Sequence, residues 1–334
     1  MNSAAPRRLG ALEVAPIGLG CMNLSHAYGH RPPPEAAERL LRRAVELGVT
    51  YFDSAALYGF GGNEELLGRV LLPHRDRIVL ASKCGMTGVD GKRVIDGRPE
   101  TLERTCEESL RRLRTETIDL YYLHRWDKRV PIEESVGALA KLVGAGKVRA
   151  IGLSEVSVAT LKKAQAVHPI AAVQTEYSLF TRDPERGLLR ACHELGAALV
   201  AFSPLGRGLL AGGVTGAYAE DDIRHSLPRF NSPHLDGNLA LARAFARLAG
   251  EAAFTPAQLA LAWLLQRAPH VIPIPGTTSI AHLEDNLGAC GVQASPDLWA
   301  RVEDCIDARQ VSGARYPEAV LREIDTDTDE PRPR

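Results

Sequence analysis

Four ionisable side chains stand at positions where they could together protonate a carbonyl group. Asp53, Lys83 and His124 each close an apolar, strand-like run, and Tyr58 follows Asp53 in the next polar segment. Enzymes built on a barrel of parallel strands place their catalytic groups at the carboxyl ends of those strands. A phenol has an ordinary pKa of about 10, so it donates a proton poorly at neutral pH unless its surroundings change. A lysine cation beside the phenol would lower that pKa.

The other two side chains would complete the set. Asp53 could hold Lys83 by an ion pair, and His124 could orient the substrate oxygen or relay a proton. Each residue also has a structural interpretation: Asp53 with Lys83 as a buried salt bridge, Tyr58 as a core tyrosine, and His124 as a hydrogen-bonded core histidine. All four together at strand ends are harder to explain by packing, so we predict a catalytic group.

Composition excludes several classes of partner but does not choose a fold. A chain of 334 residues could form one barrel or two smaller domains. A formal net charge of −1 gives no reason to expect nucleic acid or an anionic membrane as partner. The six cysteines are scattered with no C-x-x-C pair, so we expect no metal, reduced thiols and a cytoplasmic location. No stretch approaches the roughly 20 apolar residues that cross a bilayer.

Apolar runs alternate with helical patterns along most of the chain, which is typical of a parallel sheet. We predict strands over residues 17–22, 49–53, 78–83, 120–124, 150–154, 172–176, 198–203 and 271–275, and helices over 34–47, 63–71, 101–113, 132–145, 158–167, 184–195, 239–249 and 256–266. Eight such units predict an α/β fold, the (β/α)8 or TIM barrel. The alternative is a doubly wound sheet with a Rossmann site. It is disfavoured because Gly18-Leu19-Gly20 lacks the third glycine and the immediate helix of that turn.

Three additions to the barrel are expected. They are a short N-terminal β-hairpin over residues 9–16, a long loop after the seventh strand over 206–237, and a tail beyond residue 310 with an acidic, proline-rich end. The long loop has the length of a cofactor or substrate lid. We assign residues 1–312 to a single barrel domain and 313–334 to a C-terminal tail that is partly disordered.

Several motifs resemble the aldo-keto reductase family and keep its order along the chain. They are Tyr51-Phe52-Asp53-Ser54-Ala55-Ala56-Leu57-Tyr58-Gly59, Ser82-Lys83, Leu120-Tyr121-Tyr122-Leu123-His124-Arg125, Ile151-Gly152-Leu153-Ser154 and Ile274-Pro275-Gly276-Thr277. Gln174-Thr175-Glu176-Tyr177-Ser178 and Ser203-Pro204-Leu205-Gly206-Arg207-Gly208 resemble the bacterial and plant branch related to potassium-channel β subunits. The resemblance implies that Tyr58 is the acid, that Lys83 tunes it, that Asp53 fixes Lys83 and that His124 orients the carbonyl.

The same resemblance implies a nicotinamide cofactor across the barrel mouth. Ser154 and Gln174 match positions that bind the carboxamide, Tyr177 matches an aromatic ring that stacks on the nicotinamide, and residues 203–210 match the loop that follows the pyrophosphate. The cofactor positions implied are Gly20, Met22, Asp53, Ser154, Glu155, Gln174, Tyr177, Ser203, Pro204, Leu205, Arg207, Gly208, Gly276, Thr277, Thr278, Ser279, His282, Asp285 and Asn286.

The chain departs from the family pattern in two places. Glu155 stands where asparagine is frequent, and an ionised carboxylate only accepts hydrogen bonds. Residues 276–286 hold no Lys or Arg, although many relatives use one there to clamp the adenosine 2′-phosphate. Thr278, Ser279 and His282 could still bind a phosphate. An arginine from another loop could also meet the phosphate, so we expect NADP(H), slightly ahead of NAD(H).

Loops around the expected mouth carry aromatic and basic residues that could form the substrate pocket. The pocket is predicted to hold Tyr28, Tyr58, Phe60, His124 and Trp126, and His26, Phe180 and Phe230 could join its wall or simply pack. Arg125 could bind an acidic substrate, but an arginine there is common in this branch.

We predict an NAD(P)-dependent oxidoreductase of the alcohol dehydrogenase or carbonyl reductase type, which could form a homo-oligomer. It would interconvert an aldehyde or ketone with its alcohol, with the hydride from C4 of the nicotinamide and the proton from Tyr58. One alternative is a cofactor-binding redox sensor resembling the channel β subunits. A metal-dependent barrel hydrolase is the other, and it would need ligands at several strand ends.

Overall fold

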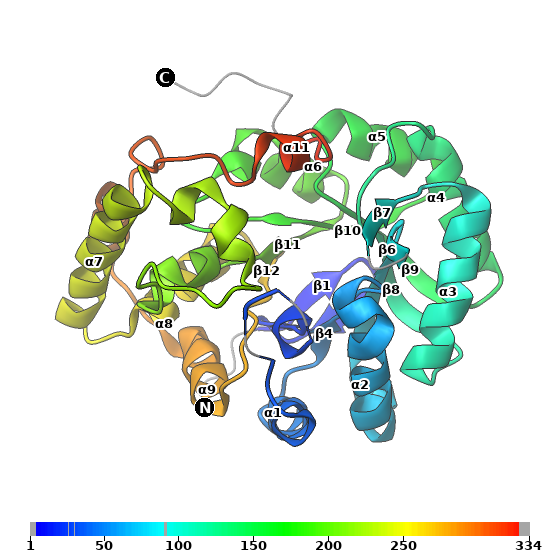
Figure 1. The fold of residues 1–334 in the computed structure, drawn as a ribbon, viewed down its shortest axis with the longest axis horizontal. Coiled ribbons are helices and arrows are strands. Elements are labelled where there is room, and N and C mark those ends of the chain that lie inside the picture. Colours follow the sequence, from blue (N-terminus) through cyan, green and yellow to red (C-terminus); the bar gives the residue numbers. More distant parts are fainter. Residues whose placement is uncertain (1–4, 26, 30, 90–91, 327–334) are drawn as a thin grey trace.

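The computed structural model describes residues 5–25, 27–29, 31–89 and 92–326. Within them, eight parallel strands form one sheet in the order of the chain, and helices cover its outside (Figure 1). The strands are β3 (Leu19–Gly20), β4 (Tyr51–Asp53), β5 (Val79–Cys84), β8 (Ile118–Leu123), β9 (Val148–Ser154), β10 (Ile170–Glu176), β11 (Ala198–Phe202) and β12 (Val271–Pro273). The predicted (β/α)8 barrel is confirmed.

The helices between and after the strands begin mostly at prolines or at capping hydroxyls, as first-turn signals predict. They are α1 (Pro34–Glu46), α2 (Gly62–Leu71), α3 (Pro99–Leu113), α4 (Ile132–Gly144), α5 (Val158–Val167), α6 (Leu188–Glu194), α7 (Leu235–Glu251), α8 (Pro256–Arg267), α9 (Ile280–Gly288), α10 (Pro296–Cys305) and α11 (Glu318–Leu321). The sequence patterns did not predict α9, α10 or α11. No single helix of the described ranges is long and apolar enough to cross a membrane, although the pair α7 and α8, bent by 89°, reaches that length and apolarity together.

The strands alternate between an inner and an outer core. Tyr51, Leu120 and Tyr122 point into the barrel, while their neighbours Phe52 and Tyr121 pack among the helices. Most strand residues on both faces are therefore buried, although β9 begins with the exposed Arg149, and this explains why the strands appear in the sequence as nearly continuous apolar runs.

The barrel closes between its first and last strands. Gly18 N donates to Pro273 O at 3.1 Å, and Gly20 N donates to Pro275 O at 3.3 Å. A Cβ on Gly20 would lie 2.8 Å from Ile274 O, so this close approach of two backbones requires glycine. The seam ends at the carboxyl ends of the strands, where Gly20 and Pro275 both face a cavity.

Two β-hairpins decorate the barrel. The predicted N-terminal hairpin is confirmed, but it lies over residues 7–14 rather than 9–16, as β1 (Arg7–Leu9) and β2 (Leu12–Val14). Its Leu9 and Val14 join the inner core beside residues that begin β10 and β11. It therefore closes the end of the barrel opposite the site. The second hairpin, β6 (Met86–Val89) and β7 (Lys92–Ile95), follows β5 and was not predicted. Among the described residues, its strands pair only with each other, so no buried apolar run marks them in the sequence.

The predicted long loop after β11 contains three short 3₁₀ helices, η5 (Gly206–Ala211), η6 (Ile223–Ser226) and η7 (Pro228–Phe230), before α7 begins at Leu235. The final described segment, red in Figure 1, passes across the structure near α5 and α6. Lys128 Nζ donates to Arg322 O at 2.9 Å, and Asp325 accepts from Thr160 Oγ1 at 2.6 Å. Residues 313–326 therefore pack on the barrel.

Replacement of Leu9 by alanine tests the role of the first hairpin. Leu9 is fully buried, so Leu9→Ala should lower the free energy of unfolding by about 2–5 kcal/mol, the cost of a large-to-small core change. Chemical denaturation measures this. Glu13→Ala, an exposed position of the same hairpin, should change little; equal losses in the two variants would contradict the packing role.

Candidate active site

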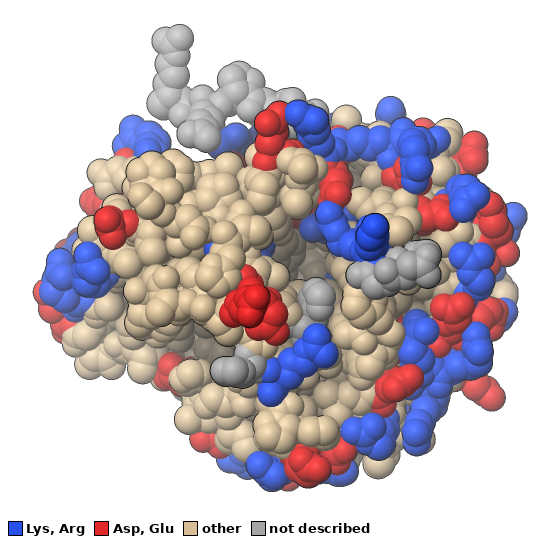
Figure 2. All heavy atoms as spheres, viewed as in Figure 1, with Lys and Arg blue, Asp and Glu red and all other residues tan. Residues whose placement is uncertain are grey.

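A cavity of about 640 Å³ opens at the carboxyl ends of the barrel strands. Figure 2 shows a hollow near the centre of this face of the molecule. Its wall comes from residues that end or directly follow β3, β4, β8, β9, β11 and β12, together with the loop after β11. This is the end of the fold where barrel enzymes build their sites.

The ammonium group of Lys83 joins two of the other candidate catalytic groups. Lys83 is fully buried, and its Nζ donates to a carboxylate oxygen of Asp53, to Ser54 O at 2.7 Å and to the Tyr58 hydroxyl at 3.3 Å. The three donor protons of the ammonium group are thus directed at three oxygens. The register explains the meeting, because Asp53 ends β4 and pairs with Ala81, two residues before Lys83 on β5.

Two further side chains form hydrogen bonds with the Asp53 carboxylate. Gln174 Nε2 on β10 donates to Asp53 Oδ2 at 2.7 Å, and the Tyr51 hydroxyl lies 3.3 Å from the same oxygen. Tyr51 in turn contacts the Tyr122 hydroxyl at 3.0 Å. The carboxylate is therefore fixed from β5, β10 and its own strand.

The protonation states follow from competing effects. Burial raises the pKa of Tyr58 above its ordinary value, and Lys83 opposes this without cancelling it. Burial alone would lower the pKa of Lys83, but Asp53 and Tyr58 outweigh it, so this pKa is raised. From the sequence alone, only the lowering of the Tyr58 pKa by lysine is expected. In the structure the phenol keeps its proton, and the ammonium its charge, at neutral pH.

His124 completes the group beside Tyr58. It directly follows β8, and its backbone N donates to Cys84 O at 2.8 Å. The two rings meet edge to face, with centroids 5.8 Å apart and planes at 84°. Asp53, Tyr58 and His124 line the cavity and Lys83 lies behind them, so the structure brings the four residues together.

Most of the predicted cofactor positions line the same cavity. These are Gly20, Met22, Asp53, Ser154, Gln174, Ser203, Pro204, Leu205, Arg207, Gly208, Gly276, Thr277, Thr278, His282, Asp285 and Asn286. Glu155, Tyr177 and Ser279 do not line it. Ser279 instead caps α9, where its hydroxyl accepts from His282 N.

The aromatic wall differs from the one suggested by sequence. Tyr177 is fully buried, packs edge to face on Trp263 and donates from its hydroxyl to Glu185 at 2.8 Å. Phe202, the last residue of β11, lines the cavity instead, as does Tyr316 from the C-terminal segment. A signal for Phe202 was present, since it directly precedes the Ser203-Pro204 pair. Tyr316 carried none.

The predicted substrate-pocket residues separate into two groups. Tyr28, Tyr58 and His124 line the cavity, whereas Phe60 is 57% exposed and packs by Gly88 of β6. The indole N–H of Trp126 donates to Val130 O at 2.9 Å, away from the cavity. Phe180 and Phe230 are buried in the outer core, and His26 lies outside the described residues.

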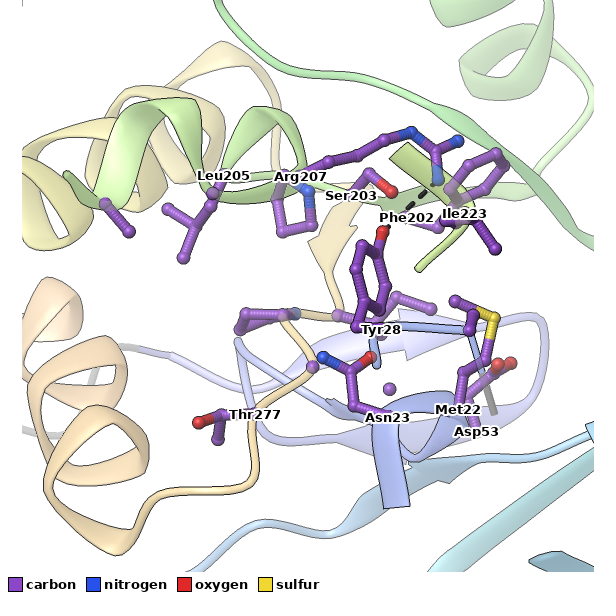
Figure 3. A pocket seen from close by; sticks show the side chains of 18 of the residues that line it. Met22, Asn23, Tyr28, Asp53, Phe202, Ser203, Leu205, Arg207, Ile223 and Thr277 are labelled. Carbon is purple, nitrogen blue, oxygen red and sulfur yellow. Dashed lines mark hydrogen bonds between the residues drawn. The ribbon is translucent and has the colours of Figure 1, made fainter. Parts of the chain in front are cut away.

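Tyr28 and Arg207 contact each other at the cavity wall. Figure 3 shows the Tyr28 ring between the segment after β3 and the loop after β11, with its hydroxyl on Arg207 at 3.2 Å. The other side of the guanidinium donates to Glu176 at 2.8 Å and to the Tyr316 hydroxyl at 2.8 Å. The predicted phosphate-binding charge of Arg207 is thus shared with a carboxylate.

The opposite end of the cavity suits a nucleotide. The first turns of α8 and α9, which follow the capping residues Thr255 and Ser279, contribute residues to its wall, and helix N-termini favour anionic groups. Asp285 accepts hydrogen bonds from Thr255 and Gln258, which joins the two helices. A Cβ on Gly276 would lie 2.9 Å from Gly20 O, so glycine there keeps the seam of the barrel narrow. Polar groups and bare backbone therefore line the space that a dinucleotide would need.

Comparison with known proteins decides the family. The family model named Aldo/keto reductase family matches residues 16–307. The chain belongs to the aldo-keto reductase family. This is an oxidoreductase family that uses nicotinamide cofactors and acts on small carbonyl compounds.

Relatives and solved structures cover nearly all of this aldo-keto reductase. It is 44% identical to probable aldo-keto reductase 1 of Glycine max, over 93% of this chain and 91% of that one. It is 40% identical to aldo-keto reductase yakc [NADP(+)] of Schizosaccharomyces pombe, over 98% of each. The structure of a glycerol dehydrogenase from Gluconobacter oxydans superposes with a TM-score of 0.84 at 31% identity, over 95% of this chain and 99% of that one.

One departure of this aldo-keto reductase from the family pattern has a structural partner. Glu155 is fully buried, and its carboxylate accepts from Arg315 Nη2 at 3.0 Å and from Glu176 N at 2.9 Å. Burial alone would raise the pKa of Glu155, but the Arg315 and Arg125 charges outweigh it and hold that pKa at about 2, below its ordinary 4.5. The C-terminal segment thus supplies the counter-charge for a buried carboxylate that follows the cavity-lining Ser154 in the chain.

Removal of the Arg315 charge should destabilise the fold. Arg315→Met leaves Glu155 buried without its main cation, which should cost about 3–5 kcal/mol at neutral pH. Because the folded-state pKa of Glu155 is depressed, its stabilisation is present above pH 4.5 and is lost as pH falls towards about 2. The deficit of the variant, measured by urea denaturation across this range, should therefore shrink in acid.

The matched double variant Glu155→Gln/Arg315→Met should lose less stability than Arg315→Met alone, since no buried charge is left unpaired. Additive losses from the two substitutions would show that the ion pair is not the interaction that matters.

Proposed function

We propose that this aldo-keto reductase interconverts an aldehyde or ketone with its alcohol, using NAD(P)H, with Tyr58 as the proton donor. The observation that carries the proposal is the contact of Lys83 Nζ with both Asp53 and the Tyr58 hydroxyl at the cavity wall. Such a cluster keeps a protonated phenol beside a fixed cation, in a cavity large enough for a substrate.

The residues divide the work between positioning and proton transfer. The bound cofactor supplies the hydride. Tyr58 gives its proton to the carbonyl oxygen, and the Lys83 cation 3.3 Å away stabilises the phenolate that remains. Asp53 keeps Lys83 charged and in place. His124, edge to face with Tyr58, orients the carbonyl oxygen towards the phenol.

We assign the nicotinamide end to Ser154, Gln174 and Phe202, and the phosphates to the loop of residues 203–208. In place of Tyr177, the ring of Phe202 would pack on the nicotinamide, because Phe202 faces the cavity and Tyr177 does not. Thr278, His282, Asp285 and Asn286 would hold the adenosine. All six cysteines are unpaired, which supports the proposed cytoplasmic location.

The alternative of a redox-sensor subunit is not favoured. The four candidate catalytic residues are complete and meet at a cavity wall, which a purely regulatory protein does not need. Among the described residues, no group of three or more His, Cys, Asp or Glu side chains is placed to hold a metal ion, so no observation favours the hydrolase alternative.

Tyr58→Phe should lower turnover by about 10²–10⁴-fold, the usual contribution of a positioned general acid, while cofactor affinity changes little. Steady-state rates and fluorescence titration with the reduced cofactor measure the two effects. Tyr121→Phe is the matched control, since that hydroxyl lies on β8 in the outer core, and it should turn over normally. Near-normal turnover of Tyr58→Phe would remove Tyr58 from its proposed role.

Discrimination between NADPH and NADH should be weak, below about 100-fold in kcat/KM. A 2′-phosphate is usually selected by charge-assisted hydrogen bonds worth about 1.5–3 kcal/mol each. The cavity offers none from residues 276–286, and Arg207 is shared with Glu176. The Schizosaccharomyces pombe relative, aldo-keto reductase yakc [NADP(+)], carries NADP(+) in its name, which supports NADP(H) as the slightly preferred cofactor.

His282→Arg would add the missing cation at the cavity wall without disturbing the Ser279 cap. It should shift preference towards NADPH by about tenfold or more, roughly 1.4 kcal/mol. His282→Gln, which adds no charge, is the control. A preference of the unmodified protein for NADPH above about 1000-fold would reveal a phosphate clamp elsewhere and contradict the argument.

A further inference from the structure

The arginines that line the cavity are not equivalent. In the described part of the chain they are Arg93, Arg125, Arg207 and Arg224. Three have carboxylate partners: Arg93 pairs with Glu323 at 2.6 Å, Arg207 with Glu176 at 2.8 Å and Arg224 with Asp222 at 2.7 Å. Arg125 has no ion pair within 4.0 Å among these residues. Arg125 thus lines the cavity without an ion pair to any described residue.

Arg125 is nevertheless almost completely buried, with 7% of its surface exposed. Of its three nitrogens, only Nη1 donates within the described ranges, to His124 O at 2.7 Å and to Ser154 Oγ at 3.2 Å. Its Nε is buried without a hydrogen-bond partner there. The two bonds of Nη1 hold the guanidinium between the residues assigned to the substrate carbonyl and to the nicotinamide, while the edge formed by Nε and Nη2 stays unused.

The neighbouring carboxylate does not neutralise Arg125. Glu155 lies close enough for the Arg125 charge to lower its pKa, but its oxygens are taken by Arg315, by Thr175 Oγ1 at 3.0 Å and by Glu176 N. The C-terminal segment, by bringing Arg315, thus satisfies Glu155 and leaves Arg125 available. A buried cation without a partner is costly, so such an arrangement is expected where a ligand brings the anion.

We propose that Arg125 binds a carboxylate of the substrate, so that the preferred substrates are oxo acids, which carry a carboxylate beside the aldehyde or ketone. The inference rests on the proposed reductase function. An arginine edge offers two parallel N–H groups that match the two oxygens of a carboxylate. Because Arg125 directly follows His124, the carboxylate would be held next to the carbonyl that His124 orients.

Two other roles for Arg125 predict different behaviour. As a partner of the nicotinamide carboxamide, it would affect cofactor affinity equally for all substrates. As a charge acting only on Tyr58, it would affect the reduction of neutral and anionic carbonyls alike. The proposed role alone predicts an effect confined to substrates with a carboxylate.

The test compares 2-, 3- and 4-formylbenzoate with their methyl esters, which keep the size and remove the charge. At least one acid should exceed its ester by about tenfold or more in kcat/KM, roughly 1.4 kcal/mol. Arg125→Gln should abolish that advantage, because the acids lose about tenfold more in kcat/KM than their esters, and Arg125→Lys should restore part of it. Cofactor affinity, measured by fluorescence titration, should be unchanged in both variants.

Arg129→Gln is the charge-matched control. The Arg129 side chain lies on the same loop, is 77% exposed and pairs with Asp127. Its removal should therefore leave the advantage of the acids in place. Equal losses for acids and esters in Arg125→Gln, or no preference for any acid in the unmodified protein, would overturn the proposal.

A binding measurement separates this proposal from the function on which it rests. If no aldehyde is turned over with either cofactor, the reductase assignment fails, and calorimetric titration of the cofactor-loaded protein with benzoate then decides on Arg125. Binding of benzoate that Arg125→Gln abolishes and Arg129→Gln keeps would support the carboxylate site. Equal binding by all three proteins would refute it.

Discussion

The burial of the Lys83 ammonium group is the constraint on which the rest of the site depends. A charge without solvent is tolerated only with a counter-charge and a full set of hydrogen bonds. Asp53, Ser54 O and the Tyr58 hydroxyl provide them, so they must come together at one point. The structure that satisfies the lysine is therefore the same structure that presents the phenol to the cavity.

The barrel makes that meeting possible. Asp53 and Lys83 lie on adjacent parallel strands, and Gln174 reaches Asp53 from β10 across the interior. Tyr51 and Tyr122 belong to the inner core, and the Tyr51 hydroxyl contacts Asp53 from that core. The first hairpin closes the end of the barrel opposite the cavity. Stability and chemistry thus share residues here. The second ion pair, Glu155 with Arg315, attaches the C-terminal segment in the same way, by giving a buried carboxylate its cation.

The sequence predicted those features of the fold and the site that depend on a local pattern of residues. Strands buried on both faces leave apolar runs, and residues at their ends carry the chemistry, so the barrel and the meeting of Asp53, Tyr58, Lys83 and His124 could be predicted. The direction in which each side chain points could not be predicted from the sequence. Tyr177 turns towards Trp263, and the cavity face belongs to Phe202, a distinction that depends on packing between distant elements. The partner of Glu155 stands 160 positions along the chain, and no motif signals it. The hairpin of β6 and β7 was missed because it buries no continuous apolar run.

The central claim is that a buried phenol beside Lys83 donates the proton. The pH dependence of kcat/KM for carbonyl reduction tests it most directly, because this parameter reports the ionisation of groups in the free enzyme. Burial raises the pKa of Tyr58 above its ordinary value. We therefore expect no loss of activity from ionisation of the proton donor between about pH 6 and pH 9, since the phenol stays protonated throughout. A fall governed by an apparent pKa of about 6 to 7, and retained in Tyr58→Phe, would show that an imidazole such as His124 supplies the proton and would contradict the account.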